Sequence, residues 1–569
     1  MAKRKSKKGE GKEKETKAKG KPLLLVESPT KARTLAQYLR GKFVVLASKG
    51  HVKDLPPKEL GVDLETFQPK YQVIKGKGKT LAFIKKVAKE SDYILIGSDP
   101  DREGEAIAHH LAEELKKLKK PIKRVLFYEI TPEAVREAVE NPTDIDPKKV
   151  EAQKARRVLD RLVGYLISPI LWKKIKGWGL SAGRVQTAAL RLIVEREREI
   201  REFVPEPFWH IYAHFKEPGE FVAKTAKYED KERAQEDFSK VKDAPFVVVE
   251  FSKEEGKANP PPPLKTSTLQ QEAHRHLGFS AERTMQLAQK LFEGVEIDGK
   301  RVGLITYHRT DSTRLSRKGV NLLRKYIREN FPKEYLPARG RTYGRDRGNV
   351  QGAHEAIRPT YPSITPESLR GKIDEDMLKL YDLIWRRALA SQMAPVRYEK
   401  RRAVLSAEGV EFVAEGLRIL FPGWSEVWPY NVKEGELPDL REGQILKPEK
   451  VELVEDETKP PARYTQASLI KELERRGIGR PSTYATIIST LFKRRYIYRR
   501  GKALAPTERG EKVLDELLKY FKDLFDYGFT AKMEEDLDRI EEGKETYDHL
   551  IREFYTELEP KLKEAEGES

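Results

Sequence analysis

Cysteine is absent from this chain, which has only five methionines and no long hydrophobic run. Without cysteine it can form no disulfide, no Cys-ligated zinc site and no thiol nucleophile. No stretch approaches the ~20 consecutive apolar residues that a membrane-spanning helix needs, and no secretory signal is evident. We therefore expect a cytoplasmic protein that binds no zinc and has no membrane partner.

Basic residues outnumber acidic residues over the whole length. The 569 residues include 110 Lys and Arg against 91 Asp and Glu, a formal net charge of +19. This balance favours a nucleic-acid partner. A charged fraction of 35% is also typical of the Lys/Glu-rich surface of a thermophilic protein, and the two explanations are compatible. A chain of this length should form roughly three to five domains.

The N-terminal part divides into a tail and an alternating segment. Residues 1–20 contain nine basic and three acidic residues and almost no apolar ones, so we expect a disordered tail that is solvated or tethers DNA. Within 21–147, strands are expected at 23–26, 43–46, 93–97 and 124–127, and helices at 29–40 and 104–119. Such alternation predicts an α/β domain with a parallel sheet and helices on both faces.

The rest of the chain changes character several times. Residues 148–204 and 460–569 are helical and basic, 205–262 and 396–459 are β-rich, and 263–395 form a helical insert. The insert begins after Asn-Pro-Pro-Pro-Pro at 259–263, a stiff linker. This order predicts a β domain that the chain enters and leaves twice, with the insert carried on it.

Four carboxylates follow two of the expected strands. Asp99, Asp101 and Glu103 alternate over five positions after the strand at 93–97, and Glu27 follows the strand at 23–26. Parallel strands present their carboxyl ends at the edge of the sheet where ligands bind. Carboxylates this close cannot all stay ionised and unpaired, and oxygen ligands favour Mg²⁺. The alternative is an acidic loop that only caps a helix, which the second strand end disfavours.

A lysine and a tyrosine have surroundings that suit phosphate chemistry. Lys31 lies one turn into the helix after Glu27, where a phosphate would be held. Tyr307 ends an apolar, strand-like segment at 302–306, and Arg309 follows it. A tyrosine hydroxyl, with a pKa of about 10, is a poor nucleophile unless a neighbouring cation stabilises the phenolate and the attacked phosphate. Most of the 23 tyrosines must be structural, so these neighbours by themselves do not single out Tyr307.

One phosphate-binding motif is incomplete. Residues 76–80 read Gly-Lys-Gly-Lys-Thr, but a P-loop needs a glycine five residues before Gly78, where Val73 stands. We therefore expect no ATPase activity.

Three segments together resemble type IA DNA topoisomerases. Leu-Val-Glu-Ser-Pro-Thr-Lys at 25–31 and Ser-Asp-Pro-Asp-Arg-Glu-Gly-Glu-Ala-Ile-Ala at 98–108 are similar to the family's Toprim domain. Leu-Ile-Thr-Tyr-His-Arg-Thr-Asp-Ser at 304–312 is similar to its active-site tyrosine motif. Further matches occur in the family's order at 180–187, 353–360 and 476–485, and the resemblance covers roughly residues 22–543.

The resemblance implies a multidomain fold with α/β, α and β parts. A Toprim domain at 21–147 would be followed by a toroidal type IA core. In that core, 148–204 and 460–569 would form a helical, winged-helix-like DNA-binding domain. The ranges 205–262 and 396–459 would form a β arch, and 263–395 a helical domain carrying Tyr307. The protein would act as a monomer at the nucleoid.

The resemblance also implies a mechanism. Tyr307 would attack a phosphate of a single-stranded segment in underwound DNA, giving a 5′-phosphotyrosine link and a free 3′-OH without ATP. Strand passage and religation would then relax negatively supercoiled DNA. The catalytic residues would be Tyr307, Glu27, Arg309, Lys31 and His354, with Glu27 carrying the proton. Mg²⁺ would be held by Glu27, Asp99, Asp101 and Glu103.

Several side chains in the matching motifs are implied to contact DNA. They are Arg102, Arg184, Gln186, Asp311, Ser312, Arg358, Arg480, Ser482 and Thr483. Ser181 is expected to cap a helix through Arg184 and Gln186. Residues 461–507 are expected to form a winged-helix unit with a basic hairpin at 496–502. An ordinary capped helix and a plain helical subdomain are the alternatives.

Other functions remain open at this point. A decatenating member of the family should carry a longer loop in the β region, which is not evident. A Toprim nuclease or primase does not need a covalent tyrosine. A non-catalytic single-strand-binding protein should lack the acidic set or Tyr307. The zinc ribbons that many bacterial relatives carry at the C-terminus cannot form without cysteine.

Overall fold

The computed structural model describes residues 20–177, 179–344 and 354–567, so nearly all of the expected tail at 1–20 lies outside the described residues. Two compact units are present. Unit 1 comprises Met1–Leu166, Glu293–Gly303 and Glu535–Glu559, and unit 2 comprises Ile167–Phe292, Leu304–Glu534 and Pro560–Ser569. No helix in the described ranges is long and apolar enough to cross a membrane.

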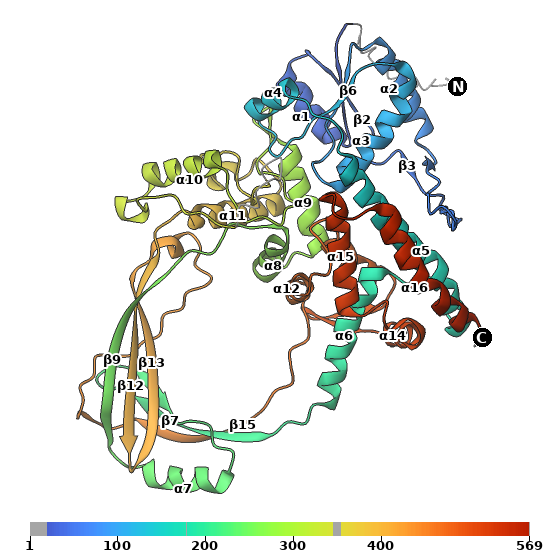
Figure 1. Ribbon diagram of the computed structural model, residues 1–569. Coiled ribbons are helices and arrows are strands. Elements are labelled where there is room, and N and C mark those ends of the chain that lie inside the picture. Colours follow the sequence, from blue (N-terminus) through green and yellow to red (C-terminus); the bar gives the residue numbers. More distant parts are fainter. Residues whose placement is uncertain (1–19, 178, 345–353, 568–569) are drawn as a thin grey trace, which may run out of the picture. The chain divides into compact units, whose positions relative to one another are not determined.

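Unit 1 is built on a four-stranded parallel sheet (Figure 1). The strand order is β2 (Val44–Ala47), β1 (Leu23–Val26), β5 (Ile94–Ile96) and β6 (Ile122–Arg124). The four helices of this region are α1 (Pro29–Leu39), α2 (Gly78–Glu90), α3 (Arg102–Leu115) and α4 (Pro132–Glu140). The predicted α/β domain is thereby confirmed, with element ends that differ by a few residues.

Alternation along the strands places helices on both faces of this sheet. Leu23 and Leu25 on β1 pack with the apolar sides of α2 and α3, where Ile84 and Leu111 are fully buried. Side chains on the other face of the strand, such as Leu24, point away from these helices because successive residues alternate. The helices α1 and α4 contact each other and form the second layer.

Segments distant in sequence complete unit 1. The hairpin β10 (Val295–Ile297) and β11 (Lys300–Val302) attaches to α1, because Tyr38 donates a hydrogen bond to the Arg301 carbonyl over 2.9 Å. A small ladder joins β3 (Lys53–Asp54) to β4 (Gln72–Val73). Parts of α5 (Pro147–Lys174), α15 (Tyr527–Glu541) and α16 (Tyr547–Gly567) also belong here. Tyr547 anchors α16 by donating to the Phe67 carbonyl over 2.6 Å.

Unit 2 contains a seven-stranded antiparallel sheet. Its order is β14 (Ile445–Leu446), β9 (Phe246–Ala258), β12 (Val396–Ala407), β13 (Val410–Phe421), β8 (Phe221–Lys224), β7 (Pro207–Phe215) and β15 (Lys450–Glu457). The core on one face centres on Phe246, whose ring lies 5.4 Å from that of Phe215 and 4.8 Å from that of Phe412. The helix α7 (Lys231–Val241) packs on β7 and β15 (Figure 1).

The helical insert leaves and re-enters this sheet at one place. Ala258, the last residue of β9, pairs with Val396, the first residue of β12. The insert therefore hangs from two neighbouring strand ends, as the order of segments predicted. It contains α8 (Thr266–Leu277), α9 (Ala281–Glu293), α10 (Arg317–Asn330) and α11 (Glu375–Ser391).

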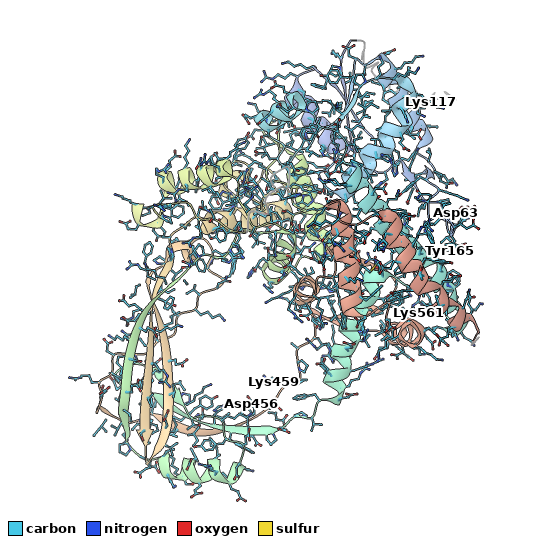
Figure 2. All side chains as sticks on the ribbon, viewed as in Figure 1. Asp63, Lys117, Tyr165, Asp456, Lys459 and Lys561 are labelled. Carbon is cyan, nitrogen blue, oxygen red and sulfur yellow. The ribbon has the colours of Figure 1, made fainter. Side chains whose placement is uncertain are left out.

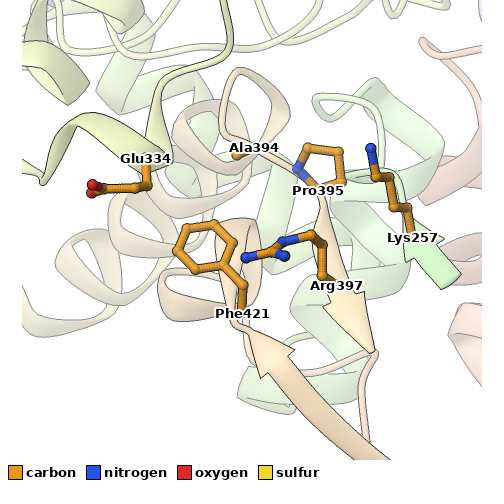
Figure 3. A pocket seen from close by; sticks show the side chains of 6 residues that line it. All are labelled: Lys257, Glu334, Ala394, Pro395, Arg397 and Phe421. Carbon is orange, nitrogen blue, oxygen red and sulfur yellow. The ribbon is translucent and has the colours of Figure 1, made fainter. Parts of the chain in front are cut away.

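A small cavity lies where the insert joins the sheet. Its volume is about 150 Å³, and it is lined by Lys257, Glu334, Ala394, Pro395, Arg397 and Phe421. Figure 3 shows Arg397 extending towards the Phe421 ring, 5.5 Å from the ring centre. None of the residues expected to act in catalysis lines this cavity.

Residues 461–507 contain two helices and a hairpin, the order of elements expected there, and this segment is called the winged-helix unit below. It consists of α12 (Gln466–Arg475), α13 (Tyr484–Lys493) and the hairpin β16 (Ile497–Arg500) and β17 (Ala503–Pro506), and α14 (Glu508–Phe521) follows it. The helix α6 (Arg184–Glu202) contacts α13, α14 and β17. The exposed side chains of Arg499, Arg500 and Lys502 make the hairpin basic.

Arg124 should be a major stabilising residue of unit 1. Its buried guanidinium donates to Glu105 Oε1, and to the carbonyls of Ser98 and Asp99, over 2.6 Å each. We expect Arg124→Met to lower the free energy of unfolding by about 3–5 kcal/mol, because it leaves the Glu105 carboxylate buried and unpaired. Urea unfolding monitored by circular dichroism measures this change. Lys117→Met, at an exposed position (Figure 2), is the matched control and should change stability by less than about 0.5 kcal/mol. Equal effects of the two variants would contradict this role.

Candidate active site

The sequence of β1 and α1 brings a lysine to the edge of the parallel sheet. Ser28 caps α1 by accepting the Lys31 N–H over 3.3 Å, and Pro29 occupies the first helical turn. A proline there loses no helical hydrogen bond and presets the backbone angle. The first turn is thus fixed, and the Lys31 side chain is 0% exposed.

Lys31 lies between two of the predicted carboxylates. Its Nζ is 3.0 Å from Glu27 Oε1 and 3.1 Å from Asp99 Oδ1. The other Glu27 oxygen accepts the Asp99 backbone N–H over 3.0 Å. Glu27 and Asp99 meet because β1 and β5 are parallel neighbours whose carboxyl ends share an edge.

This arrangement shifts the pKa values of Glu27 and Lys31. Burial and the nearby Asp99 charge raise the pKa of Glu27 from 4.5 to about 8, although Lys31 acts in the opposite direction. Burial alone would lower the pKa of Lys31, but the charges of Glu27 and Asp99 outweigh it and raise that pKa. One ammonium among several carboxylates therefore stays charged, and Glu27 holds a proton near neutral pH.

The other two acidic residues have different partners. Asp101 caps α3, since its Oδ1 accepts the Gly104 N–H over 2.7 Å. Glu103 accepts from His51 Nε2 over 2.8 Å and from Gln153 over 3.4 Å. Burial alone would raise the pKa of Glu103, but the hydrogen bond and charge of His51 hold it at about 2.

Gly104 is required for this turn. A Cβ on Gly104 would lie 1.7 Å from the Asp99 carbonyl oxygen, so any side chain would displace the acidic segment. The Asp-Pro-Asp-Arg-Glu-Gly pattern therefore has a steric reason as well as a chemical one.

The carboxylate oxygens at this edge of the parallel sheet suit a hard divalent cation, but several of them make other contacts. Glu27 and Asp99 are adjacent carboxylates whose repulsion a cation would relieve, and every candidate ligand is an oxygen. Asp101 and Glu103 hold the partners described above, and the described residues contain no group of three or more His, Asp or Glu side chains already arranged around one point. Lys31 supplies the positive charge between Glu27 and Asp99.

Three features of unit 1 had no signal in the sequence. Glu293, from the end of α9, accepts the Ser28 hydroxyl over 3.0 Å and its charge contributes to the raised pKa of Glu27. His51 holds Glu103. Asp538 and Glu541, on α15, bind the Arg102 guanidinium, with 2.9 Å between Arg102 Nε and Glu541 Oε2. All of these partners are far from the motif in sequence, so local patterns could not find them.

The tyrosine motif and residues 354–360, the described part of the 353–360 motif, come together in unit 2. Thr306 N donates to the Arg358 carbonyl over 3.0 Å, and Arg358 N donates to the Thr306 hydroxyl over 3.0 Å. Ile305 forms a single bridge with Pro359. The prediction of a continuous strand at 302–306 is wrong, because β11 ends at Val302 and only this bridge follows it in the segment.

Tyr307 lies in an aromatic surrounding and is 4% exposed. The rings of Phe292 and His308 each lie 5.2 Å from its ring centre, and the Phe292 contact is edge-to-face. Arg309 and His354 are half-buried on the same two motifs. Packing within the insert therefore fixes the ring of Tyr307. The hydrogen bonds between Thr306 and Arg358 fix the adjacent backbone.

Two of the expected DNA-binding arginines are held in buried ion pairs. Arg358, 1% exposed, binds Glu355 through two contacts of 2.9 and 3.0 Å. Arg184, 2% exposed, lies 2.8 Å from Glu534. Burial alone would raise the pKa of Glu355, but Arg358 and the Ser316 N–H lower it. In this conformation both guanidinium groups are bound to carboxylates within unit 2, and contact with DNA remains a prediction for them and for Arg102.

The prediction that Ser181 caps a helix is wrong. The helix α6 begins at Arg184 with Gly183 at its N-cap, and no side chain caps it. Ser181 instead exchanges backbone hydrogen bonds with the Tyr496 hydroxyl, over 2.8 and 2.9 Å. A Cβ on Gly183 would lie 2.3 Å from Gln186 Oε1, so the Gln186 side chain would have to move to admit one.

The other expected DNA contacts are more accessible. Asp311 is exposed and Gln186 and Ser312 are half-buried. Arg480 donates to the carbonyls of Gly477 and Gly479 over 3.0 and 2.7 Å, closing the loop before α13. The half-buried Ser482 and Thr483 follow in that loop. Backbone amides and hydroxyls of this kind can contact a phosphate chain without reading sequence.

Comparison with known proteins agrees with these motifs. The sequence profile of the DNA topoisomerase family matches residues 144–552, and that of the Toprim domain matches residues 22–130. DNA topoisomerase 1 of Aquifex aeolicus is 47% identical over 546 residues, covering 94% of this chain and 98% of that protein. DNA topoisomerase 1 of Thermotoga maritima is 47% identical over 542 residues, covering 94% and 84%.

Similarity extends to three dimensions. The solved structure of full-length topoisomerase I from Thermotoga maritima matches with a TM-score of 0.86 and 46% sequence identity, covering 95% of this chain and 90% of that one. The extent of these matches, the parallel Toprim sheet and the tyrosine motif lead to one assignment: the chain belongs to the type IA DNA topoisomerases.

Proposed function

We propose that this topoisomerase relaxes negatively supercoiled DNA without ATP and with Mg²⁺, through a transient 5′-phosphotyrosine link to Tyr307. The observation that carries the proposal is the contact of the buried Lys31 ammonium with Glu27 at 3.0 Å and with Asp99 at 3.1 Å, where two neighbouring parallel strands end. A carboxyl held in this way, with its pKa raised, can give and take a proton near neutral pH, which reversible strand cleavage requires.

The chemistry is a balanced exchange of two ester bonds. The Tyr307 oxygen bonds to phosphorus as the bond from phosphorus to the 3′-oxygen breaks. The proton of Glu27 passes to the leaving 3′-oxygen, and the tyrosine proton passes to solvent. Religation reverses each step, with Glu27 taking the proton back. The number of phosphoester bonds is unchanged, so ATP is not needed.

Cations of this chain would stabilise the attacked phosphate. Lys31, Arg309 and His354 are the side chains assigned to this role, because charge develops on the phosphate oxygens in the transition state. The Lys31 ammonium is held in place by Glu27 and Asp99, so it need not reorganise during the reaction.

Glu27, Asp99, Asp101 and Glu103 are the proposed Mg²⁺ ligands. The bound ion would supply positive charge that draws the DNA backbone and the free 3′ end to this edge of the sheet. Asp101 and Glu103 would exchange their present contacts with Gly104 and His51 for the ion.

The DNA substrate would be a single-stranded segment of an underwound duplex, bound by a monomer at the nucleoid. The net charge of +19 favours such a partner. Arg102, Arg184 and Arg358 would reach DNA only by leaving their carboxylate partners. Movements that open a strand-passage gate are of the kind that exchange such contacts.

Tyr307→Phe is the first test. We expect the native protein to relax negatively supercoiled plasmid with Mg²⁺ and no ATP, and the variant to show no relaxation, because it lacks the attacking oxygen. Agarose-gel electrophoresis of the plasmid measures this. The variant should unfold at the native temperature within a few degrees, since the ring and its packing remain.

Three other results would contradict the proposed mechanism or the proposed main activity. If Tyr307→Phe relaxes the plasmid, or if linear fragments accumulate without attached protein, the tyrosine mechanism is wrong and a Toprim nuclease explains the activity. If the native enzyme resolves linked circles far faster than it relaxes plasmid, decatenation is its main activity.

The proton on Glu27 can be observed directly. In metal-free protein we expect an infrared carbonyl band of a protonated carboxyl at pH 7, lost as the pH rises through about 8 and absent from Glu27→Gln. Added Mg²⁺ should shift this loss to lower pH, because metal and proton compete. A band that persists unchanged in Glu27→Gln would assign the proton to another carboxyl.

The same pKa predicts a trend in stability. Folded Glu27 holds its proton more tightly than the unfolded chain does, so its contribution is fully present below about pH 4.5 and is lost as pH rises towards about 8. Urea unfolding of native protein and Glu27→Gln at pH 5, 6.5 and 8 measures the difference. The stability of the variant relative to native should increase with pH.

A further inference from the structure

The start of α8 is bound to the backbone that follows Tyr307. Thr266, the first residue of α8, is fully buried, and its hydroxyl donates to the His308 carbonyl over 2.6 Å. The same hydroxyl accepts the Thr310 N–H over 2.8 Å, and Thr266 N donates to the Thr310 carbonyl over 3.0 Å. Any displacement of Thr266 is therefore transmitted to residues 308–310.

The two neighbours of Thr266 both bind one carboxylate outside the insert. Glu474, in the last turn of α12, has its Oε1 3.2 Å from Lys265 Nζ, and its Oε2 accepts the Ser267 hydroxyl. The Ser267 side chain is buried, and those of Lys265 and Glu474 are only 25% and 31% exposed. Each oxygen of Glu474 thus has its own partner on the segment 265–267.

The helix that carries Glu474 is itself well fixed. Thr465 caps α12 by accepting the Ser468 N–H over 3.1 Å. Gln466 Oε1 accepts the Ala281 N–H at the start of α9 over 2.9 Å. The helices α8 and α12 pack directly against each other (Figure 1). The Glu474 carboxylate is therefore a fixed point against which the start of α8 is held.

A nearby glutamate on the same helix lacks this role. Glu472 binds Arg475 and Arg476, with contacts of 2.6 and 2.7 Å, so its partners lie at the end of its own helix. Glu472 offers a matched control: the same residue type, two positions away, with no contact to the segment 265–267 among its described partners.

We propose that Glu474 is a positioning residue for Tyr307, acting through Lys265, Thr266 and Ser267; this inference rests on the proposed role of Tyr307 as the nucleophile. Removing the carboxylate leaves Lys265 and the Ser267 hydroxyl without this partner and frees the start of α8. A shift of about 1 Å in a reacting group can cost as much as 100-fold in rate. Because Glu474 belongs to the winged-helix unit, the tyrosine is aligned only while the insert is docked on that unit.

The test measures how fast the protein becomes covalently attached to a single-stranded oligonucleotide. The oligonucleotide carries a fluorophore at its 3′ end and no label at its 5′ end. Single-turnover rates at saturating oligonucleotide report alignment of Tyr307, and fluorescence anisotropy of the intact oligonucleotide reports binding. We expect Glu474→Ala to lower the rate about tenfold or more and to leave the dissociation constant within about twofold, because misalignment affects the transition state only. Glu474→Gln, which keeps an acceptor for Ser267, should fall between Ala and native. Glu472→Ala should match native in both quantities.

A double-mutant cycle separates positioning from a general loss of structure. If Glu474 acts through Ser267, then Ser267→Ala and Glu474→Ala should be strongly non-additive in rate, whereas Glu474→Ala and the control Glu472→Ala should be additive. Reversing the pair, with Lys265→Glu and Glu474→Lys together, should recover part of the rate lost in each single variant.

The outcomes distinguish this inference from the proposed function. If native protein forms no tyrosine-linked product with the oligonucleotide, the proposed function fails before Glu474 is tested. If native protein and Glu474→Ala react at the same rate, the positioning role is overturned. It is also overturned if Glu474→Ala raises the dissociation constant by the same factor by which it lowers the rate. Additive effects of Ser267→Ala and Glu474→Ala would overturn it too.

Discussion

The buried ammonium of Lys31 is the contact on which the acidic edge of the parallel sheet depends. Glu27 and Asp99 are brought together by the pairing of β1 with β5, and their charges would otherwise repel at low solvent exposure. One lysine cannot neutralise every neighbouring carboxylate, so Glu27 retains a proton to about pH 8. A site assembled for charge compensation is thereby also a site that can exchange a proton.

Buried arginine–glutamate pairs recur around the sites. Arg124 with Glu105 fixes the backbone before Asp99, Arg358 with Glu355 supports the segment beside Tyr307, and Arg184 with Glu534 fixes the start of α6. Such pairs add little net stability over apolar packing, but breaking one is costly because it leaves a buried charge. They favour a small number of well-defined arrangements of the segments that they join.

The tyrosine is positioned through backbone contacts from several segments. Thr306 pairs with Arg358, and Thr266 binds the residues on either side of Arg309. The segment around Thr266 in turn contacts Glu474 on α12. Packing by Phe292 holds the ring, while these polar contacts determine where the chain passes. The insert and the winged-helix unit are therefore connected by directional polar contacts as well as by the packing of α8 on α12.

The sequence by itself determined the order of elements and the chemistry of the motifs. Alternating apolar segments predicted the parallel sheet, and the segment order predicted the doubly entered β domain. Residue types pointed to Glu27, Asp99 and Lys31 as candidates, and the resemblance to a family added Tyr307. Local sequence patterns gave wrong predictions where a single hydrogen bond decides the local structure. The examples are the helix cap expected at Ser181 and the strand expected at 302–306. Only the tertiary structure decided which distant residues contact the motifs and their supporting segments. Glu293, His51, Asp538 and Glu474 come from segments remote in sequence, and periodicity carries no information about contacts between remote segments.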